Sequence, residues 1–128
     1  MRGQVSAEYM LLFMVSLSLL GVSAVSLGAI RDSAMRSLDM GDFRASAISL
    51  ADAVDEVCAS GNNNRASVYL ASAVEVDSER SEDGWLIRIR GANATVVRDS
   101  LCEAKPSSLP KGKVYIENIG GSASFTEP

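Results

Sequence analysis

The feature that most constrains this chain is an uncharged, apolar stretch that runs from Tyr9 to Ile30. As an α-helix, this stretch of 22 residues would be about 33 Å long, which is enough to cross the hydrocarbon core of a bilayer. A secretory signal peptide would have a shorter apolar region, followed by a cleavage site of small residues. The sequence therefore predicts a helix that lies in lipid or against other helices.

Small side chains occur all around this predicted helix, at Ser16, Ser18, Gly21, Ser23, Ala24, Ser26 and Gly28. Small residues let helix backbones approach closely, and Ala24 with Gly28 forms a small-xxx-small pair. The pattern favours a helix that packs against other helices. The alternative is a single-pass anchor in which the small residues have no such role.

One carboxylate, Glu8, stands at the mouth of the apolar stretch, shortly after Gln4 and Ser6. Burying a lone carboxylate among apolar groups is costly, so a buried Glu8 requires a partner. The alternative is that Glu8 lies at the cytoplasmic headgroup level and stays solvated. The positive charge of Arg2 predicts that the N-terminus is cytoplasmic and that the bulk of the chain lies outside.

The segment Gln4-Val5-Ser6-Ala7-Glu8-Tyr9-Met10-Leu11-Leu12 resembles the class III signal motif of archaeal type IV pilins, in which a Gln, a Ser, a Glu and a Leu recur ahead of an apolar helix. All four positions match, at Gln4, Ser6, Glu8 and Leu12. The resemblance covers roughly the first thirty residues. Its leader, Met1-Arg2-Gly3, is shorter and less basic than many in that family.

The resemblance implies that a membrane-bound prepilin peptidase cuts residues 1–3 from the chain, between Gly3 and Gln4. It also implies that Glu8 pairs with the new N-terminal amine at Gln4 of a neighbouring subunit during assembly. An ammonium and a carboxylate that share an apolar filament core offset each other's desolvation and fix the axial register. Gln4, Ser6 and Glu8 are thus the expected assembly residues.

After Ile30 the pattern becomes amphipathic over residues 31–60. Apolar residues recur at spacings of three and four, at Met40, Phe43, Ala47, Leu50, Val54 and Val57, and Asp42, Ser49, Asp52, Asp55 and Glu56 lie away from that face. Gly61 is suited to a left-handed helix cap and the asparagines after it to a tight loop. One helix over residues 4–60 is expected, the stalk of a lollipop whose head comprises residues 61–128.

The head changes to a period of two, which is typical of strands. Alternation is clear from Val68 to Val76 and from Trp85 to Arg90, with Asp83-Gly84 as a turn signal between them. Residues 93–98 and 113–119 predict further strands, and residues 105–112 a loop. The expected fold class is α+β, with a long N-terminal helix and a small antiparallel sheet of about four strands on the Phe43–Val57 face.

The two cysteines, Cys58 and Cys102, lie far apart in sequence without a CxxC spacing. A disulfide between them would close a long loop and stabilise a small head by about 4 kcal/mol. An extracytoplasmic location favours this bond, and two buried free thiols are the alternative.

Asn93-Ala94-Thr95 fits the N-glycosylation sequon, which is frequent by chance. Because archaeal pilins are often glycosylated, the resemblance favours a glycan at Asn93.

Several functions are disfavoured by composition. The net charge of −4 and the absence of a basic cluster make nucleic acid an unexpected partner. The chain has no His, and no group of residues pairs a nucleophile with a base, so neither an enzyme, a metal site nor a cofactor is expected.

Together these observations predict a structural subunit of an extracellular type IV pilus-like filament, a homo-oligomer that serves surface adhesion. Its precursor would lie in the cytoplasmic membrane and meet the prepilin peptidase and the pilus assembly machinery. The alternatives are a solitary membrane-anchored protein whose extracellular head binds a ligand or partner, and a minor pilin-like subunit.

Overall fold

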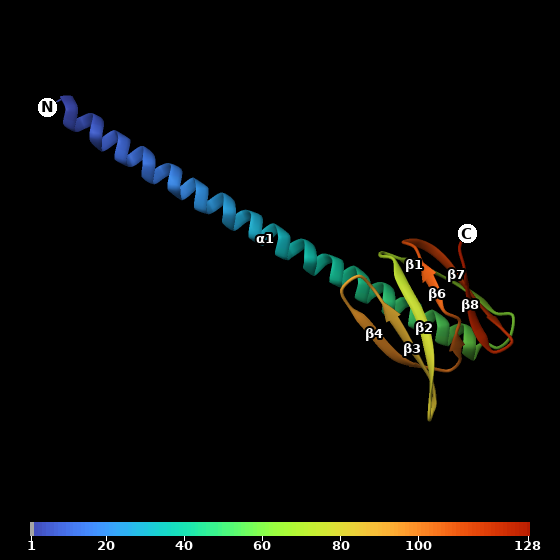
Figure 1. Ribbon diagram of the computed structural model, residues 1–128. Helices are drawn as coiled ribbons and strands as arrows, with labels where there is room; N and C mark the ends of the chain where they lie inside the picture. Colours follow the sequence, from blue (N-terminus) through green and yellow to red (C-terminus); the bar gives the residue numbers. More distant parts are fainter. Residues whose placement is uncertain (1) are drawn as a thin grey trace. The chain divides into compact units, whose positions relative to one another are not determined.

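A computed structural model describes residues 2–128 of the chain, with side chains from Gly3 onward. The predicted leader residue Met1 and the side chain of Arg2 lie outside this described part. Within it, one helix is followed by strands: α1 (Arg2–Ala59), β1 (Arg65–Leu70), β2 (Val74–Ser81), β3 (Gly84–Arg90), β4 (Thr95–Ser100), β5 (Glu103–Ala104), β6 (Ser107–Leu109), β7 (Gly112–Ile119) and β8 (Ser122–Thr126) (Figure 1). The expected α+β class, with a long N-terminal helix before a mainly antiparallel β region, is confirmed.

The chain divides into two compact units, and the boundary lies inside α1. The first unit ends at Ser37, and the second comprises Leu38–Pro128. The sequence-based division at Gly61 instead assigned the whole helix to the stalk. The last third of α1 belongs with the strands because its apolar side chains form part of their core.

The face of α1 that the periodicity predicted to be apolar is the centre of that core. Five of its six residues are at most 6% exposed: Phe43, Ala47, Leu50, Val54 and Val57. Met40 was also predicted on this face but is 49% exposed, because it lies one turn before the first buried residue of the helix. Ala51, which the pattern did not single out, is 2% exposed.

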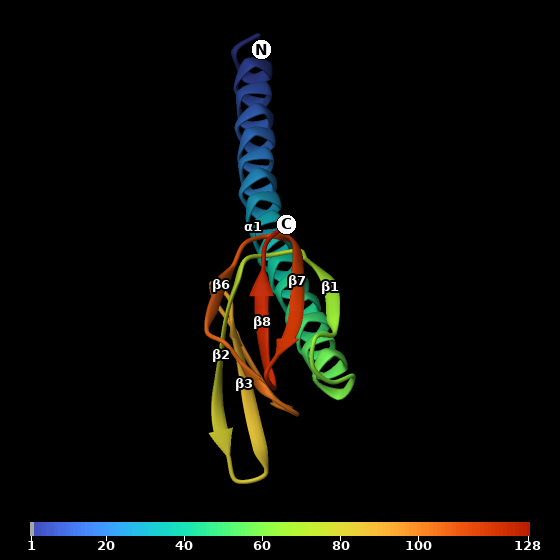
Figure 2. The same cartoon turned by 90° about the vertical axis from the view of Figure 1, so that its right-hand side faces the viewer.

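Two four-stranded sheets cover this face of the helix, rather than the single sheet expected. Sheet A has the strand order β1-β7-β8-β5, and sheet B has the order β4-β3-β2-β6. All neighbouring strands are antiparallel except β5 and β8, which pair in parallel. Figure 2 shows β1, β7 and β8 of sheet A side by side.

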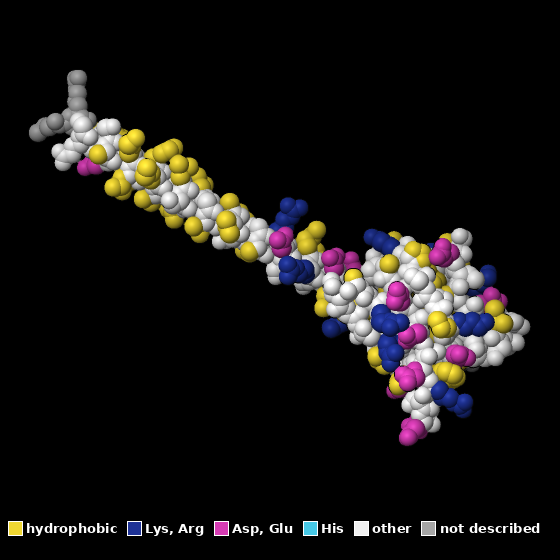
Figure 3. Space-filling view, in the orientation of Figure 1, with side chains coloured by type: hydrophobic (Ala, Val, Ile, Leu, Met, Phe, Trp, Pro, Cys, Tyr) yellow, Lys and Arg dark blue, Asp and Glu magenta, His cyan; other side chains and the backbone are white. Residues whose placement is uncertain are grey.

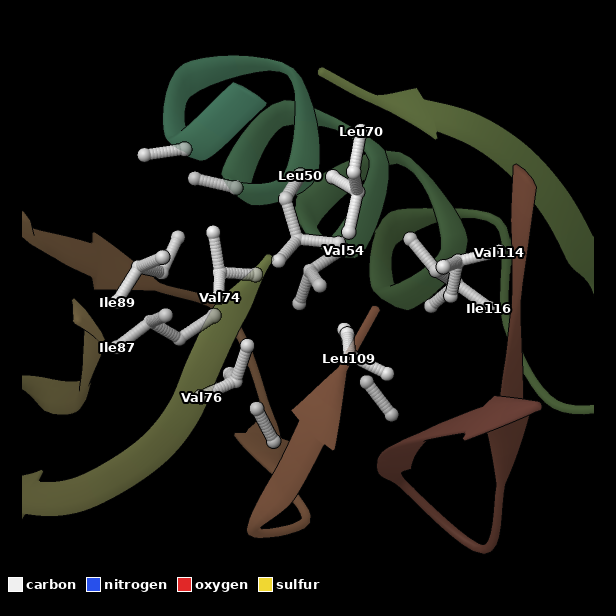
Figure 4. Packing of buried hydrophobic residues seen from close by; sticks show 14 of the residues in the cluster. Leu50, Val54, Leu70, Val74, Val76, Ile87, Ile89, Leu109, Val114 and Ile116 are labelled. Atoms are coloured by element: carbon white, nitrogen blue, oxygen red, sulfur yellow. The ribbon is translucent and has the colours of Figure 1, made fainter. Parts of the chain in front are cut away.

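The core lies where α1 meets both sheets, as Figure 4 shows. Leu50 and Val54 of the helix contact a cluster that takes Val74, Val76, Ile87 and Ile89 from sheet B and Leu70, Val114 and Ile116 from sheet A. The two sheets are also joined directly, since the Ser78 hydroxyl of β2 donates to the Ala104 carbonyl at 2.8 Å and accepts from the Ala104 N–H at 3.1 Å. One small core thus serves three layers.

The helix ends where the sequence predicts. Gly61 has a φ of 92°, the left-handed conformation that glycine adopts readily at a helix C-terminus. The buried Asn118 side chain of β7 donates to the Val57 carbonyl at 3.4 Å, and its backbone exchanges hydrogen bonds with Asn63 and Asn64. The cap is therefore fixed to sheet A.

The strand bounds depart from the expected ones, most clearly between Val68 and Val76 and in the predicted loop. The alternation from Val68 to Val76 is two strands, and β1 and β2 belong to different sheets. The break at Ala71 is held by the Ser46 hydroxyl of α1, which accepts a hydrogen bond from the Ala71 N–H at 2.8 Å. The segment predicted as a loop contains β6, which pairs with β2 through Val74 and Leu109.

Candidate functional site

The residues of the predicted assembly site lie in the first turns of α1, and all are exposed. Gln4, Glu8 and Leu12 are spaced by four and share one face of the helix, whereas Ser6 lies elsewhere on it. Glu8 forms no salt bridge and no side-chain hydrogen bond with any described residue. Its carboxylate is therefore free to pair with a group from outside the described chain.

The helix surface that follows Glu8 is apolar and uncovered. Every large apolar side chain from Tyr9 to Ile30 is exposed, from 49% at Val15 to 75% at Val25. The segment is long and apolar enough to cross a membrane by length and composition. In Figure 3 hydrophobic side chains cover this half of α1, and charged side chains become frequent only farther along the chain.

Four serine hydroxyls of the apolar segment are satisfied within the helix. The hydroxyls of Ser16, Ser18, Ser23 and Ser26 each donate to the carbonyl four residues earlier, at 2.8–2.9 Å. A Cβ atom added at Gly21 or Gly28 would meet nothing within 4 Å. The segment therefore presents small residues and serine hydroxyls that are already hydrogen-bonded, a surface suited to lipid or to another helix.

A disulfide joins the end of α1 to the segment between β4 and β5. Cys58 and Cys102 are bonded, with their Cα atoms 6.0 Å apart and a sequence separation of 44. Cys102 is 7% exposed and belongs to the core cluster. The expected pairing is therefore present, and the bond fastens the helix to the strands that surround it.

The sequon lies in the turn between β3 and β4. Asn93 and Thr95 are exposed, and the turn is closed by a hydrogen bond from the Gly91 N–H to the Ala94 carbonyl at 2.8 Å. Residues 93 and 94, expected at the start of a strand, instead precede β4. This position leaves the Asn93 side chain exposed to solvent.

One site was not foreseen from the sequence: a groove of about 460 Å³ near the β2–β3 turn. Its lining includes three carboxylates, an aromatic ring and two hydroxyls, from Asp55, Asp83, Asp99, Trp85, Ser81 and Ser100. These residues come from α1, the end of β2, the β2–β3 turn, β3 and β4, so no spacing in the sequence predicts the groove. Of the three carboxylates, Asp55 is the one that described residues hold, since it accepts hydrogen bonds from the Ser100 hydroxyl at 3.1 Å and the Leu101 N–H at 3.3 Å.

Within residues 2–128, no three acidic or cysteine side chains come together in a way that would hold a metal ion. The chain also resembles nothing in the comparisons with known proteins: no family model, no curated protein and no solved structure matches it.

Proposed function

We propose that this chain is a structural subunit of an extracellular type IV pilus-like filament that serves surface adhesion. The precursor lies in the cytoplasmic membrane, a prepilin peptidase cuts it between Gly3 and Gln4, and the assembly machinery polymerises it through the first half of α1. One difference between two parts of the described chain supports this proposal most. The second unit has its own hydrophobic core, whereas the apolar side chains of the first half of α1 are exposed.

The observation that carries the proposal is the exposure of the whole Tyr9–Ile30 surface. Exposed apolar area costs about 25 cal/mol per Å² in water, so a surface of this size must be covered. This surface takes no part in the core of the second unit, which begins at Leu38 and uses α1 residues at and beyond Phe43. Lipid covers the segment before assembly, and identical segments of other copies cover it in the filament.

Glu8 fits this scheme as the polar group that selects a register. In a filament core an unpaired carboxylate would be strongly unfavourable, and the Gln4 amine of a neighbour is a partner of opposite charge. The lack of any described partner for Glu8 within its own chain leaves it available for that pairing. Since only a cut chain has an amine at Gln4, cleavage and assembly become linked.

Replacement of Glu8 by Ala tests this role. The variant should enter the membrane and fold its disulfide-bonded head as the native chain does, yet yield several-fold less filament in sheared cell-surface material. Asp32→Ala, which removes a carboxylate from the other end of the apolar segment, is the matched control and should assemble normally. Normal filaments from Glu8→Ala would rule out the pairing.

Mass spectrometry of the N-terminus separates the proposal from a second candidate. A solitary membrane-anchored protein, with a head that binds a ligand, is favoured by the length of the apolar helix and would retain Met1. A subunit of a filament would begin at Gln4 and would be recovered with the sheared material. A cut chain that is only a trace component of that material would instead be a minor pilin-like subunit.

A further inference from the structure

The outer surface of sheet A carries an aromatic and basic patch, here called the basic platform and formed by Arg65, Tyr69, Lys113 and Tyr115. The Tyr115 ring lies between two cations, with the Arg65 guanidinium carbon 5.4 Å and the Lys113 ammonium 5.2 Å from its centroid. Tyr69 is 66% exposed. The platform thus combines one exposed and one half-buried tyrosine with two positive charges.

The strand register explains why these side chains gather. Tyr69 of β1 lies opposite Lys113 of β7, and Ser67 lies opposite Tyr115, so the two tyrosines are diagonal neighbours. Val114 and Ile116, which alternate with them, point into the core. The platform therefore belongs to the solvent face of the sheet, and nothing in the described chain covers it.

The charges of the platform are only partly compensated. Arg65 approaches Glu117 at 3.6 Å, a partly exposed pair that contributes little. Lys113 forms no salt bridge with any described residue. A free ammonium beside an aromatic ring attracts a carboxylate or a second aromatic group.

The groove near the β2–β3 turn has the opposite character. Its lining carries Asp55, Asp83 and Asp99 but no Lys or Arg. Asp83 and Asp99 enter no salt bridge within residues 2–128, although other carboxylates of sheet B do, such as Asp77 with Arg90 at 2.7 Å. Three like charges around one groove repel each other unless a cation enters.

We propose that the basic platform of one copy docks into the acidic groove of the next copy, with Lys113 among the three carboxylates. The inference rests on the proposed filament, and it names the contact between heads that would accompany the packing of the helices. Charge complementarity supports it: two cations without full compensation face three carboxylates without a cation. Trp85 in the groove adds a ring against which the tyrosines or cations pack.

The symmetry of such a contact agrees with a filament. Platform and groove are different surfaces, formed largely by sheet A and by sheet B with α1, and no salt bridge or side-chain hydrogen bond described in the chain joins them. A contact between two different surfaces repeats head to tail and leads to an open helical polymer rather than to a closed dimer. Complementary potentials also reject wrong registers.

A charge exchange tests the docking. In cells that express the full chain, Lys113→Glu and Asp99→Lys should each lower the amount of sheared filament about tenfold, because each replaces an attraction by a repulsion. The double variant Lys113→Glu with Asp99→Lys should restore it to within about twofold of the native amount. A double variant that stays as low as the single ones would overturn the proposal.

The matched control is Lys105→Glu with Asp99→Lys, which has the same net charge as the restoring pair but leaves the platform intact. It should remain about tenfold low. Equal recovery in both double variants would attribute the effect to net charge and contradict the docking. Native chains that form no filament at all would refute the proposed function instead, so the two failures are distinguishable.

Cross-linking of native filaments gives an independent measurement. A carbodiimide condenses the Lys113 amine with a carboxyl group in contact, forming an amide while the reagent becomes its urea. Dimers on a denaturing gel should contain a Lys113–Asp83 or Lys113–Asp99 linked peptide. Lys113→Arg, which keeps the charge but removes the amine, should assemble and lose that peptide. Native dimers linked only at other residues would contradict the contact.

Discussion

The two halves of α1 have similar backbones and opposite relations to their surroundings. Leu20 in the first half is 66% exposed, whereas Leu50 in the second is fully buried. Ser23 in the first half donates to its own helix, whereas Ser46 in the second accepts from the backbone of a distant strand. The comparison teaches that one helix contributes its second half to a hydrophobic core and leaves the apolar surface of its first half exposed.

The largest change in stability is expected when the disulfide is removed, because this bond fastens only the second half of α1 to the head. Replacing both Cys58 and Cys102 by Ala should lower the free energy of unfolding of residues 38–128 by about 4 kcal/mol, since the loop closed by the bond is long. Fluorescence of Trp85, the single tryptophan of the chain, reports this transition during thermal unfolding in detergent. Extraction from membranes should not change. An unaltered melting temperature would mean that the head does not depend on the bond.

A leucine in each half gives the sharpest matched pair. Leu50→Ala should cost about 3 kcal/mol of head stability, because it opens a cavity among tightly packed neighbours. Leu20→Ala should leave the melting temperature of the head unchanged, because Leu20 lies outside the second unit and takes no part in its core. The same fluorescence measurement applies to both variants. If the two melting temperatures fell by similar amounts, the second half of α1 would not be the only half that stabilises the head.

Glycine substitutions are expected to change the stability of the head least. A Cβ atom added at Gly91 would lie 2.4 Å from the Phe43 ring, so Gly91→Ala should cost about 1–3 kcal/mol through displacement of the ring. A Cβ atom at Gly28 meets nothing within 4 Å, so Gly28→Ala should leave head unfolding unaffected and act, if anywhere, on assembly. Denaturant midpoints of the two variants decide between these outcomes, and equal midpoints would contradict the packing described for Phe43.

Local patterns predicted the parts of the fold that depend on local physics. The spacing of Phe43, Leu50 and Val54 predicted the buried face of α1, and Gly61 predicted the end of the helix. Asp83-Gly84 marked the β2–β3 hairpin, although the turn residues are Glu82 and Asp83, with Gly84 opening β3 at a φ of 151°. In each case neighbouring residues in sequence carry the whole signal.

The missing parts depend on contacts between distant residues. Leu70 and Val74 are both apolar and an even number of residues apart, so the sequence pattern does not reveal that the chain changes sheets between them. The groove forms because Asp55 of α1, Asp83 of the β2–β3 turn and Asp99 of β4 lie close together although they are distant in sequence. Strand β8 was not predicted, because Ser122–Thr126 is short and mostly polar and forms a strand by pairing with β7.

The covalent link between Cys58 and Cys102 also has a mechanical meaning. A load that enters the second unit along α1 reaches Cys58 and passes through the bond directly to Cys102. The 44-residue separation is thereby taken out of the force path, which removes about 150 Å of extensible chain at roughly 3.4 Å per residue. When α1 and the C-terminus are pulled apart, the closed loop that contains β1 to β4 cannot be extended, and only the chain from Cys102 onward can lengthen.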